Sequence, residues 1–274
     1  MNKTQISLII GSIVVVVLLL FANTKLPKKE SVAPMVSDHA GEKIANISTL
    51  VENAKNGLTV EQKQNFEKLE QALKPSSNQR KSFENMIRLW DSLRQPMVAA
   101  YYVEQAAISA STEVNWKQAG DRYYAATRFV KETDRSVLFN KALECFQKTV
   151  EINPNNVEAK VSLASCYVEG TADPMKGIGM LRDIEKTDSN NVNLQLSFAF
   201  FSEKSGQWDR AIARFKKVLK IKPEFIEAYL HLADAYEQKG DKQQAIESLE
   251  KYIALTEDVT IKIEVQNYID KLKH

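Results

Sequence analysis

Residues that carry redox chemistry, metal binding or acid–base catalysis are scarce in this chain of 274 residues. It has two cysteines, Cys145 and Cys166, and they form no Cys-x-x-Cys motif of the kind that marks redox-active or zinc-binding pairs. Both fall on the apolar faces of predicted helices, so we expect two small buried apolar residues. A disulfide between neighbouring helices stays open at this stage.

The three histidines, His39, His231 and His274, have no partner at helical spacing that would complete a metal site or an acid–base pair. The chain also lacks a glycine-rich phosphate loop, a Gly-x-Ser-x-Gly motif and a His-Glu-x-x-His motif. We therefore predict no catalytic residue, no metal site, no cofactor and no enzymatic activity.

Glycine and proline are few, at nine and seven residues, which is typical of a mostly helical chain. An excess of one charge is also missing from most of the sequence. The first 29 residues carry four lysines and no acid, whereas the remainder carries 33 basic and 35 acidic residues. Because nucleic-acid-binding domains show a strongly basic face, this near-neutral body predicts no nucleic-acid partner.

Long apolar runs are absent except for one, which covers residues 6–22. Its length is at the short end for a membrane-spanning helix. The segment Leu20-Phe21-Ala22 is a poor signal-peptidase site, because the residue three positions before the cut should be small. We therefore favour an uncleaved transmembrane signal anchor over a cleaved signal peptide, with a tail at 1–5 and a linker at 23–40.

Two signals disagree about the side of the membrane on which the body lies. Lys25, Lys28 and Lys29 follow the apolar run, and the positive-inside rule then favours a cytoplasmic body. A very short tail ahead of an N-terminal apolar run is instead the usual arrangement of exported, anchored proteins. We predict a single-pass inner-membrane protein with a periplasmic C-terminal body, and the cytoplasmic orientation is the alternative.

A pattern that recurs after 34 residues dominates the C-terminal half. The matching residues are Leu196 and Leu230, Ala199 and Ala233, Gly206 and Gly240, Ala211 and Ala245, Phe215 and Leu249, and Ile221 and Leu255. Each unit reads as two amphipathic helices joined at a glycine that can adopt the left-handed conformation. Period and positions resemble the tetratricopeptide repeat, a helix–turn–helix module whose copies stack into a solenoid.

The resemblance extends over residues 113–274 and predicts an all-α fold. We expect four units, at about 113–156, 157–191, 192–225 and 226–258, followed by a capping helix at 259–274. Trp116, Ala119, Gly120 and Tyr123 match the first-helix signature, and the first unit is longer than the pattern near residues 130–136. Residues 41–112 form a helical lead-in, which begins its clearest helix at the Thr59–Gln62 capping box.

In the tetratricopeptide family, the first helix of each unit lines a concave groove that binds peptides. Carried onto this chain, the resemblance implies a partner-binding groove formed by Lys117, Asp121, Tyr124, Val161, Ser165, Leu196, Phe200, Leu230, His231 and Asp234. Four of these, Tyr124, Leu196, Phe200 and Leu230, predict an apolar track with polar edges, suited to a peptide with apolar anchors. For the two leucines, packing between helices is an equally good interpretation.

The arrangement as a whole resembles a group of membrane-anchored repeat proteins from Bacteroidota, through Ser165-Cys166-Tyr167 and the stretch Asp173 to Ile178. More loosely, it is similar to the anchored periplasmic repeat protein beside the Sec translocon of enterobacteria. The resemblance implies a membrane-anchored scaffold that binds a protein or peptide in protein export or envelope assembly. A self-assembling structural protein, with residues 41–110 in its own groove, is a further alternative.

Overall fold

The computed structural model describes residues 46–73 and 78–273, and within them it contains thirteen α-helices, one short 3₁₀ helix and no strand. The predicted all-α class is therefore confirmed. The α-helices are α2 (Ile47–Asn56), α3 (Val60–Ala72), α4 (Gln79–Ser92), α5 (Pro96–Ser109), α6 (Glu113–Ala126), α7 (Glu132–Ile152), α8 (Val157–Gly170), α9 (Pro174–Thr187), α10 (Val192–Lys204), α11 (Trp208–Ile221), α12 (Ala228–Gln238), α13 (Lys242–Leu255) and α14 (Val259–Lys273).

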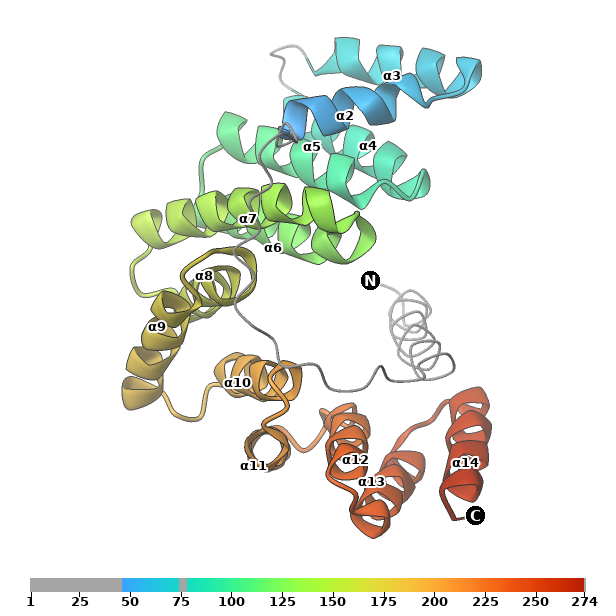
Figure 1. The fold of residues 1–274 in the computed structure, drawn as a ribbon. Coiled ribbons are helices and arrows are strands. Elements are labelled where there is room, and N and C mark those ends of the chain that lie inside the picture. The colour runs from blue at the N-terminus through green and yellow to red at the C-terminus, as the bar shows by residue number, and fades with distance from the viewer. Residues whose placement is uncertain (1–45, 74–77, 274) are drawn as a thin grey trace. The chain divides into compact units, whose positions relative to one another are not determined.

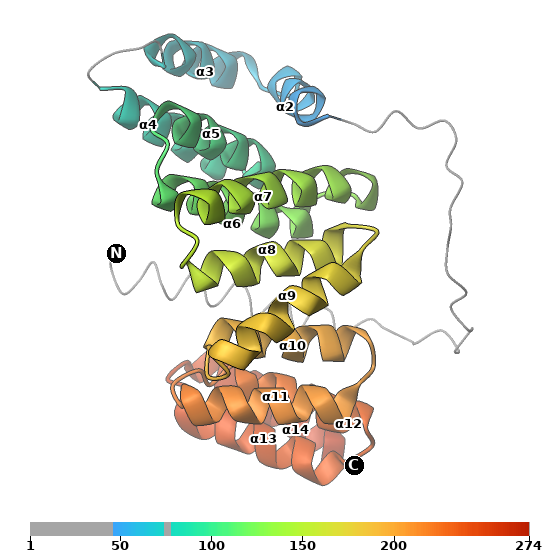
Figure 2. The ribbon, with the colours of Figure 1, turned by 90° about the vertical axis from the view of Figure 1, so that its left-hand side faces the viewer.

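From α3 onward, consecutive helices pack against each other in chain order, and α2 packs against α5, so that the described residues form a helical-hairpin solenoid (Figures 1 and 2). The most extensive contacts are those of α6 with α7, α5 with α6, α8 with α9, α10 with α11, and α12 with α13. Helices α4 and α5 pair in the same way and continue onto α6. The first helix of each pair also approaches the first helix of the next pair, as α6 does to α8 and α8 to α10.

Two glycines close the turns of the last two hairpins as the repeat predicts. Gly206 and Gly240 have φ values of 70° and 84°, in the left-handed region that other residues avoid. In the first turn, the N–H of Gly206 donates to the carbonyl of Glu203 at 2.9 Å, and that of Gln207 to Ser202 at 2.8 Å. This is the Schellman motif, which satisfies the last carbonyls of a helix. Gly240 and the residue after it repeat the same pair of bonds.

Helix starts also follow the sequence. The Thr59 hydroxyl accepts from the N–H of Gln62 at 3.3 Å, and the Gln62 side chain accepts from the N–H of Thr59 at 2.9 Å, which completes the predicted capping box. Asp173 caps α9 with Pro174 as its first residue. The extra length of the first unit forms the 3₁₀ turn Thr127–Phe129 and the 21-residue helix α7.

For helix α4 of the lead-in, the helical spacing of the sequence predicts an apolar stripe of Phe83, Ile87 and Leu93, with Trp90 beside it. This prediction is wrong in detail. In the structure Trp90 is fully buried and Ile87 and Leu93 are only partly buried, so the core stripe is Phe83, Met86 and Trp90. The large indole ring sets the orientation of the helix, because burying it removes the most apolar surface from water.

The hydrophobic core falls into separate parts. One cluster runs from α2 to α8 and joins the lead-in to the first repeat, with Trp90, Tyr123, Leu138 and Phe146 fully buried. A second, smaller cluster lies between α8, α9 and α10, around Leu181 and Leu194. The lead-in is therefore packed as part of the same stack.

Both cysteines are fully buried and free, so the interpretation as small apolar residues is confirmed and no disulfide joins them. Burial raises the pKa of both thiols well above the ordinary range, which leaves them protonated and unreactive. The predicted anchor at 6–22, the tail at 1–5 and the linker at 23–40 lie outside the described residues. Among the described residues, no helix is long and apolar enough to cross a membrane.

Candidate functional site

The ten predicted groove residues lie on four first helices, α6, α8, α10 and α12. We refer to the surface of these helices that carries them as the first-helix face. Each helix is tied to the next across this face by side-chain contacts. The face is therefore continuous, although its ten residues differ widely in exposure.

The contacts between α6 and α8 use two of the predicted residues. The ammonium group of Lys117 lies 2.9 Å from a carboxylate oxygen of Asp121 and 3.6 Å from one of Glu158. The hydroxyl of Tyr124 donates to Glu169, and its ring packs edge-to-face on Phe139 with centroids 5.8 Å apart. Tyr124 is thus held by the neighbouring helix and offers a partner only part of its ring.

The residues predicted on α8 are buried. Val161 and Ser165 are 3% and 6% exposed. The Ser165 hydroxyl lies 3.3 Å from that of Ser197 on α10, so it joins two first helices. Both residues pack between helices, and they offer a partner almost no surface. Leu196 and Leu230 are half-buried, which fits the alternative that they serve mainly in packing.

Between α10 and α12, three aromatic rings form a cluster. Phe200 is 38% exposed and packs edge-to-face on Phe215 and on His231, with centroids 5.6 and 5.0 Å away. The His231 ring stacks on Phe215 at 4.9 Å with an interplanar angle of 8°. Phe215 is fully buried and supports both rings from below. Phe200 is thereby presented at the surface in a fixed orientation.

Acidic side chains surround this cluster. Oε1 of Glu203 is buried and has no hydrogen-bond partner among the described residues. It lies 3.5 Å from Nδ1 of His231, too long for a good hydrogen bond. Burial raises the pKa of Asp234 on the next helix, and nearby carboxylates act in the same direction. These acidic groups give the surroundings of the exposed Phe200 ring a negative charge.

Carboxylates outnumber cations along the whole first-helix face. The side-chain contacts on this face involve five carboxylates, Asp121, Glu158, Glu169, Glu203 and Glu237, against the two lysines Lys117 and Lys204. The sequence predicted an apolar track with polar edges, but it did not predict that these edges are negatively charged. The signal was present, however, because acidic residues recur at the ends of the first helices. The face is suited to apolar side chains with basic neighbours.

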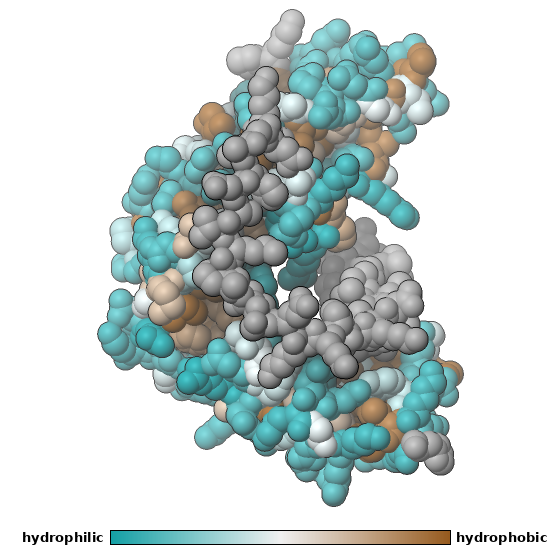
Figure 3. All heavy atoms as spheres, viewed as in Figure 1, coloured by the Kyte–Doolittle hydropathy of each residue, from teal (hydrophilic) through white to brown (hydrophobic). Residues whose placement is uncertain are grey.

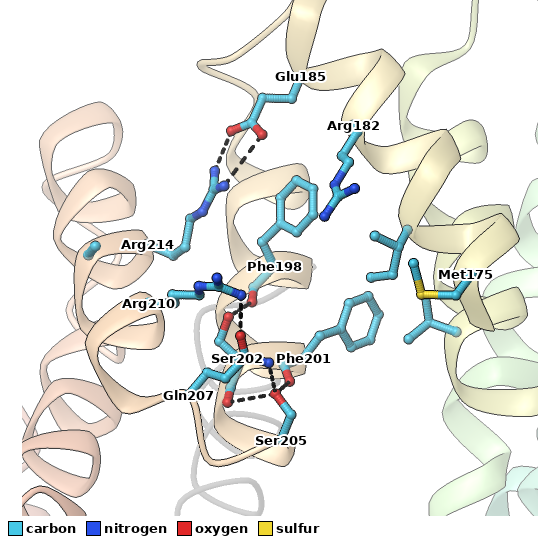
Figure 4. A pocket seen from close by; sticks show the side chains of 13 residues that line it. Met175, Arg182, Glu185, Phe198, Phe201, Ser202, Ser205, Gln207, Arg210 and Arg214 are labelled. Atoms are coloured by element: carbon cyan, nitrogen blue, oxygen red, sulfur yellow. Dashed lines mark hydrogen bonds and ion pairs between the residues drawn. The ribbon is translucent and has the colours of Figure 1, made fainter.

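A second feature was not predicted from the sequence. A cleft of about 670 Å³ opens between α9, α10 and α11, and Phe198, Phe201, Met175, Arg182, Arg210 and Arg214 line it (Figure 4). The helical pattern of α10 predicts that Phe198 and Phe201 pack inside the protein, yet both are only half-buried. Two arginines four residues apart on α11, opposite two phenylalanines on α10, were the available signal.

Among the described residues, the side of the molecule drawn in Figure 3 shows no broad apolar patch. On the side drawn in Figure 3, hydrophilic residues predominate over the described part of the chain, and hydrophobic ones gather in small separate groups. No group of three or more metal-binding side chains occurs among the described residues. The two surfaces with aromatic side chains at defined positions are therefore the candidates for binding.

Comparison with known proteins agrees with the repeat pattern. Residues 203–259 match the family model of the tetratricopeptide repeat. Superkiller protein 3 of Schizosaccharomyces pombe is 25% identical over 125 residues, which cover 43% of this chain. The chain spans only 9% of the length of that relative.

Among solved structures, a tetratricopeptide repeat protein from Parabacteroides merdae superposes with a TM-score of 0.52 at 15% identity, over 82% of this chain and 89% of that one. PilW, a type IV pilus biogenesis factor, superposes with a TM-score of 0.50 at 20% identity, over 69% of this chain and 84% of that one. Residues 203–259 thus form a tetratricopeptide repeat segment, and the described chain has the solenoid fold of tetratricopeptide repeat proteins.

Proposed function

We propose that this protein is a membrane-anchored tetratricopeptide repeat scaffold, of the kind that its sequence resembles in Bacteroidota. It binds a segment of a partner protein on the first-helix face and performs no catalysis. The apolar run at 6–22 supports the anchor, and the short N-terminal tail supports a periplasmic body engaged in export or envelope assembly. Anchoring concentrates the binding face at the membrane, so a weak affinity for the partner is sufficient.

One observation carries the binding role: Phe200 is exposed on a rigid aromatic support, with the carboxylate of Glu203 beside it. An exposed ring in a fixed position gives an apolar anchor with little loss of side-chain entropy. The carboxylates around the cluster favour lysine or arginine beside that anchor. We therefore propose a partner segment in which an apolar residue alternates with basic ones.

The test is a photo-crosslink in living cells, with a photoreactive amino acid at position 200. Position 220 on α11 is the control, because Lys220 is exposed on a second helix and lines neither surface. An adduct from position 200 and none from position 220 would support the groove. Equal adducts from both positions, or none from either, would refute it.

The side of the membrane is tested independently. Because Cys145 and Cys166 are both buried, the natural chain gives little background in thiol labelling. A single accessible thiol at Lys220→Cys should react with a membrane-impermeant maleimide in intact spheroplasts if the body is periplasmic. Labelling that appears only after lysis would place the body in the cytoplasm and leave the binding proposal untouched.

A further inference from the structure

The cleft between α9, α10 and α11 lies at a junction of the stack where the apolar packing is small and a polar contact joins the helices. Helix α9 touches α10 far less than α7 touches α8 or α11 touches α12. The junction is bridged by Arg214, which donates to Glu185 on α9 and, at 2.8 Å, to Oε1 of the fully buried Gln195 on α10. This brace holds the helices apart and leaves the apolar side chains beside it uncovered.

Those uncovered side chains form an apolar floor. Phe198 and Phe201 project from α10 into the cleft, and Met175 lies opposite them on α9 (Figure 4). Met175 is 64% exposed, and both phenylalanine rings are half-buried. A cleft of this volume is within the range of ligand-binding pockets, and methionine and phenylalanine adapt well to apolar side chains of a partner.

The rim of the cleft is basic. Arg182, Arg210 and Arg214 line it, with Glu185 as the one acidic residue among its lining side chains. Glu185 is engaged by Arg214, whose guanidinium also lies 4.5 Å from the centroid of Phe198. Arg210 donates to the side chain of Gln207, and neither it nor Arg182 has a carboxylate partner among the described residues. Two guanidinium groups are thus free to bind carboxylates with paired hydrogen bonds.

We propose that this cleft is a second docking site, which takes an acidic segment of a partner protein with an aromatic or aliphatic anchor. The anchor would enter between Phe198, Phe201 and Met175, and aspartate or glutamate beside it would pair with Arg182 and Arg210. Charge complementarity selects this occupant over the basic segment proposed for the first-helix face. The solenoid then holds two different segments on opposite sides of α10.

The test is a selection of random twelve-residue peptides displayed on phage, carried out against the full-length chain in detergent micelles. Enriched peptides are then labelled, and their Kd is measured by fluorescence anisotropy. We expect peptides that combine acidic residues with an aromatic or aliphatic residue. The double variant Arg182→Glu/Arg210→Glu should raise the Kd of these peptides by about tenfold to a hundredfold. Each substitution removes a charge-assisted pair and adds repulsion.

The matched control reverses two exposed arginines elsewhere, Arg88→Glu/Arg128→Glu, and should leave the Kd unchanged. A second variant, Ala213→Trp, fills the cleft from its exposed α11 wall without any change of charge, and should also abolish binding. Melting curves of all variants exclude unfolding as the cause.

Three results would overturn the proposal: no enrichment of acidic, apolar peptides; equal weakening by both charge reversals; or full binding to Ala213→Trp. Phe200→Ala separates this site from the first-helix face. It should leave the acidic peptides bound, so failure of one site is distinguishable from failure of the other.

Discussion

Two of the three phenylalanines of helix α10, Phe198 and Phe200, have surroundings that differ in almost every respect. Phe200 lies against two other rings on the first-helix face, beside the carboxylate of Glu203. Phe198 lies in the cleft under the guanidinium of Arg214. Side chains two residues apart on a helix are separated by about 200° of rotation around the helix axis, so the two rings face opposite sides. In a stack of helix pairs, one first helix can therefore present two binding surfaces of opposite charge.

Removal of the aromatic support of the first-helix face should cost more folding stability than removal of a ring from the cleft. Phe215→Ala deletes a fully buried ring that contacts both Phe200 and His231, so we expect a loss of about 4 kcal/mol. Phe198→Ala removes a half-buried ring from a cleft with room beside it and should cost about 1 kcal/mol. Urea unfolding followed by circular dichroism measures both.

The same pair of variants also separates the two surfaces in function. Phe215→Ala should abolish the crosslink from position 200, because the exposed ring loses its support. Phe198→Ala should leave that crosslink intact and weaken only the binding of the acidic peptides. Similar losses of stability in the two variants would contradict the difference in packing on which the comparison rests.

Two glycines on α9 test how that helix is held at the edge of the cleft. A Cβ at Gly177 would lie 2.3 Å from the carbonyl oxygen of Ala164 on α8, whereas one at Gly179 would meet nothing within 4 Å. Gly177→Ala must push two helix backbones apart and should cost about 3 kcal/mol. Gly179→Ala should instead stabilise the protein by about 0.5 to 1 kcal/mol, through helix propensity. Thermal unfolding of both variants decides the matter, and equal effects would show that α8 and α9 are not in close contact.

The two surfaces were not equally accessible to prediction. Repeats with a fixed period place the first helices side by side, so the helices of the first-helix face could be assigned before the structure, as could the left-handed turns at Gly206 and Gly240. The exposure of each residue within that face could not be predicted, because it depends on the side chains that meet there: Val161 is buried in a cluster with Leu181 of α9 and Leu194 of α10. The resemblance to a family predicts which positions lie on the first-helix face, whereas the exposed area of each side chain depends on its local packing.

The cleft could not be predicted, because a repeat pattern describes an ideal junction between units. The departure arises from one brace, in which Arg214 joins residues 29 and 19 positions earlier in the sequence on two other helices. Such a contact has no periodic signature. Phe198 and Phe201 have the pattern of core residues, and the sparse contact between α9 and α10 leaves both rings partly exposed.

The polar brace itself should contribute an intermediate amount to stability. Arg214→Gln leaves the buried side chain of Gln195 and the carboxylate of Glu185 without their donor, so we expect a loss of about 2 kcal/mol at pH 7. The hydrogen bond from Arg214 lowers the pKa of Glu185 in the folded state. The stability from this pair is therefore present above the unfolded pKa and is lost as pH falls through the folded pKa.

Between about pH 5 and pH 3, the natural protein should lose more stability than Arg214→Gln does, so that the two unfolding free energies converge in acid. Denaturant titrations at a series of pH values measure this. Lys220→Gln, on the same helix but not among the charges that lower the pKa of Glu185, serves as the control for the loss of a positive charge. A constant difference between natural protein and Arg214→Gln at all pH values would show that Glu185 is not held by Arg214.

The smallest effect concerns the charge of the first-helix face. Burial raises the pKa of Asp234, because the ionised form is poorly solvated, and the carboxylates of Glu203 and Glu237 add repulsion. A carboxyl group with a raised folded pKa destabilises the protein above that pKa, so Asp234→Asn should be more stable near pH 7. The gain should be at most about 0.5 kcal/mol, since the side chain is partly exposed and screened. It should disappear below the unfolded pKa, where both side chains are neutral.

The same variant should bind a basic partner segment less well, and this is what separates a surface selected for binding from one selected for stability. A variant that is both less stable at pH 7 and equally able to form the crosslink from position 200 would remove Asp234 from the acidic binding surface.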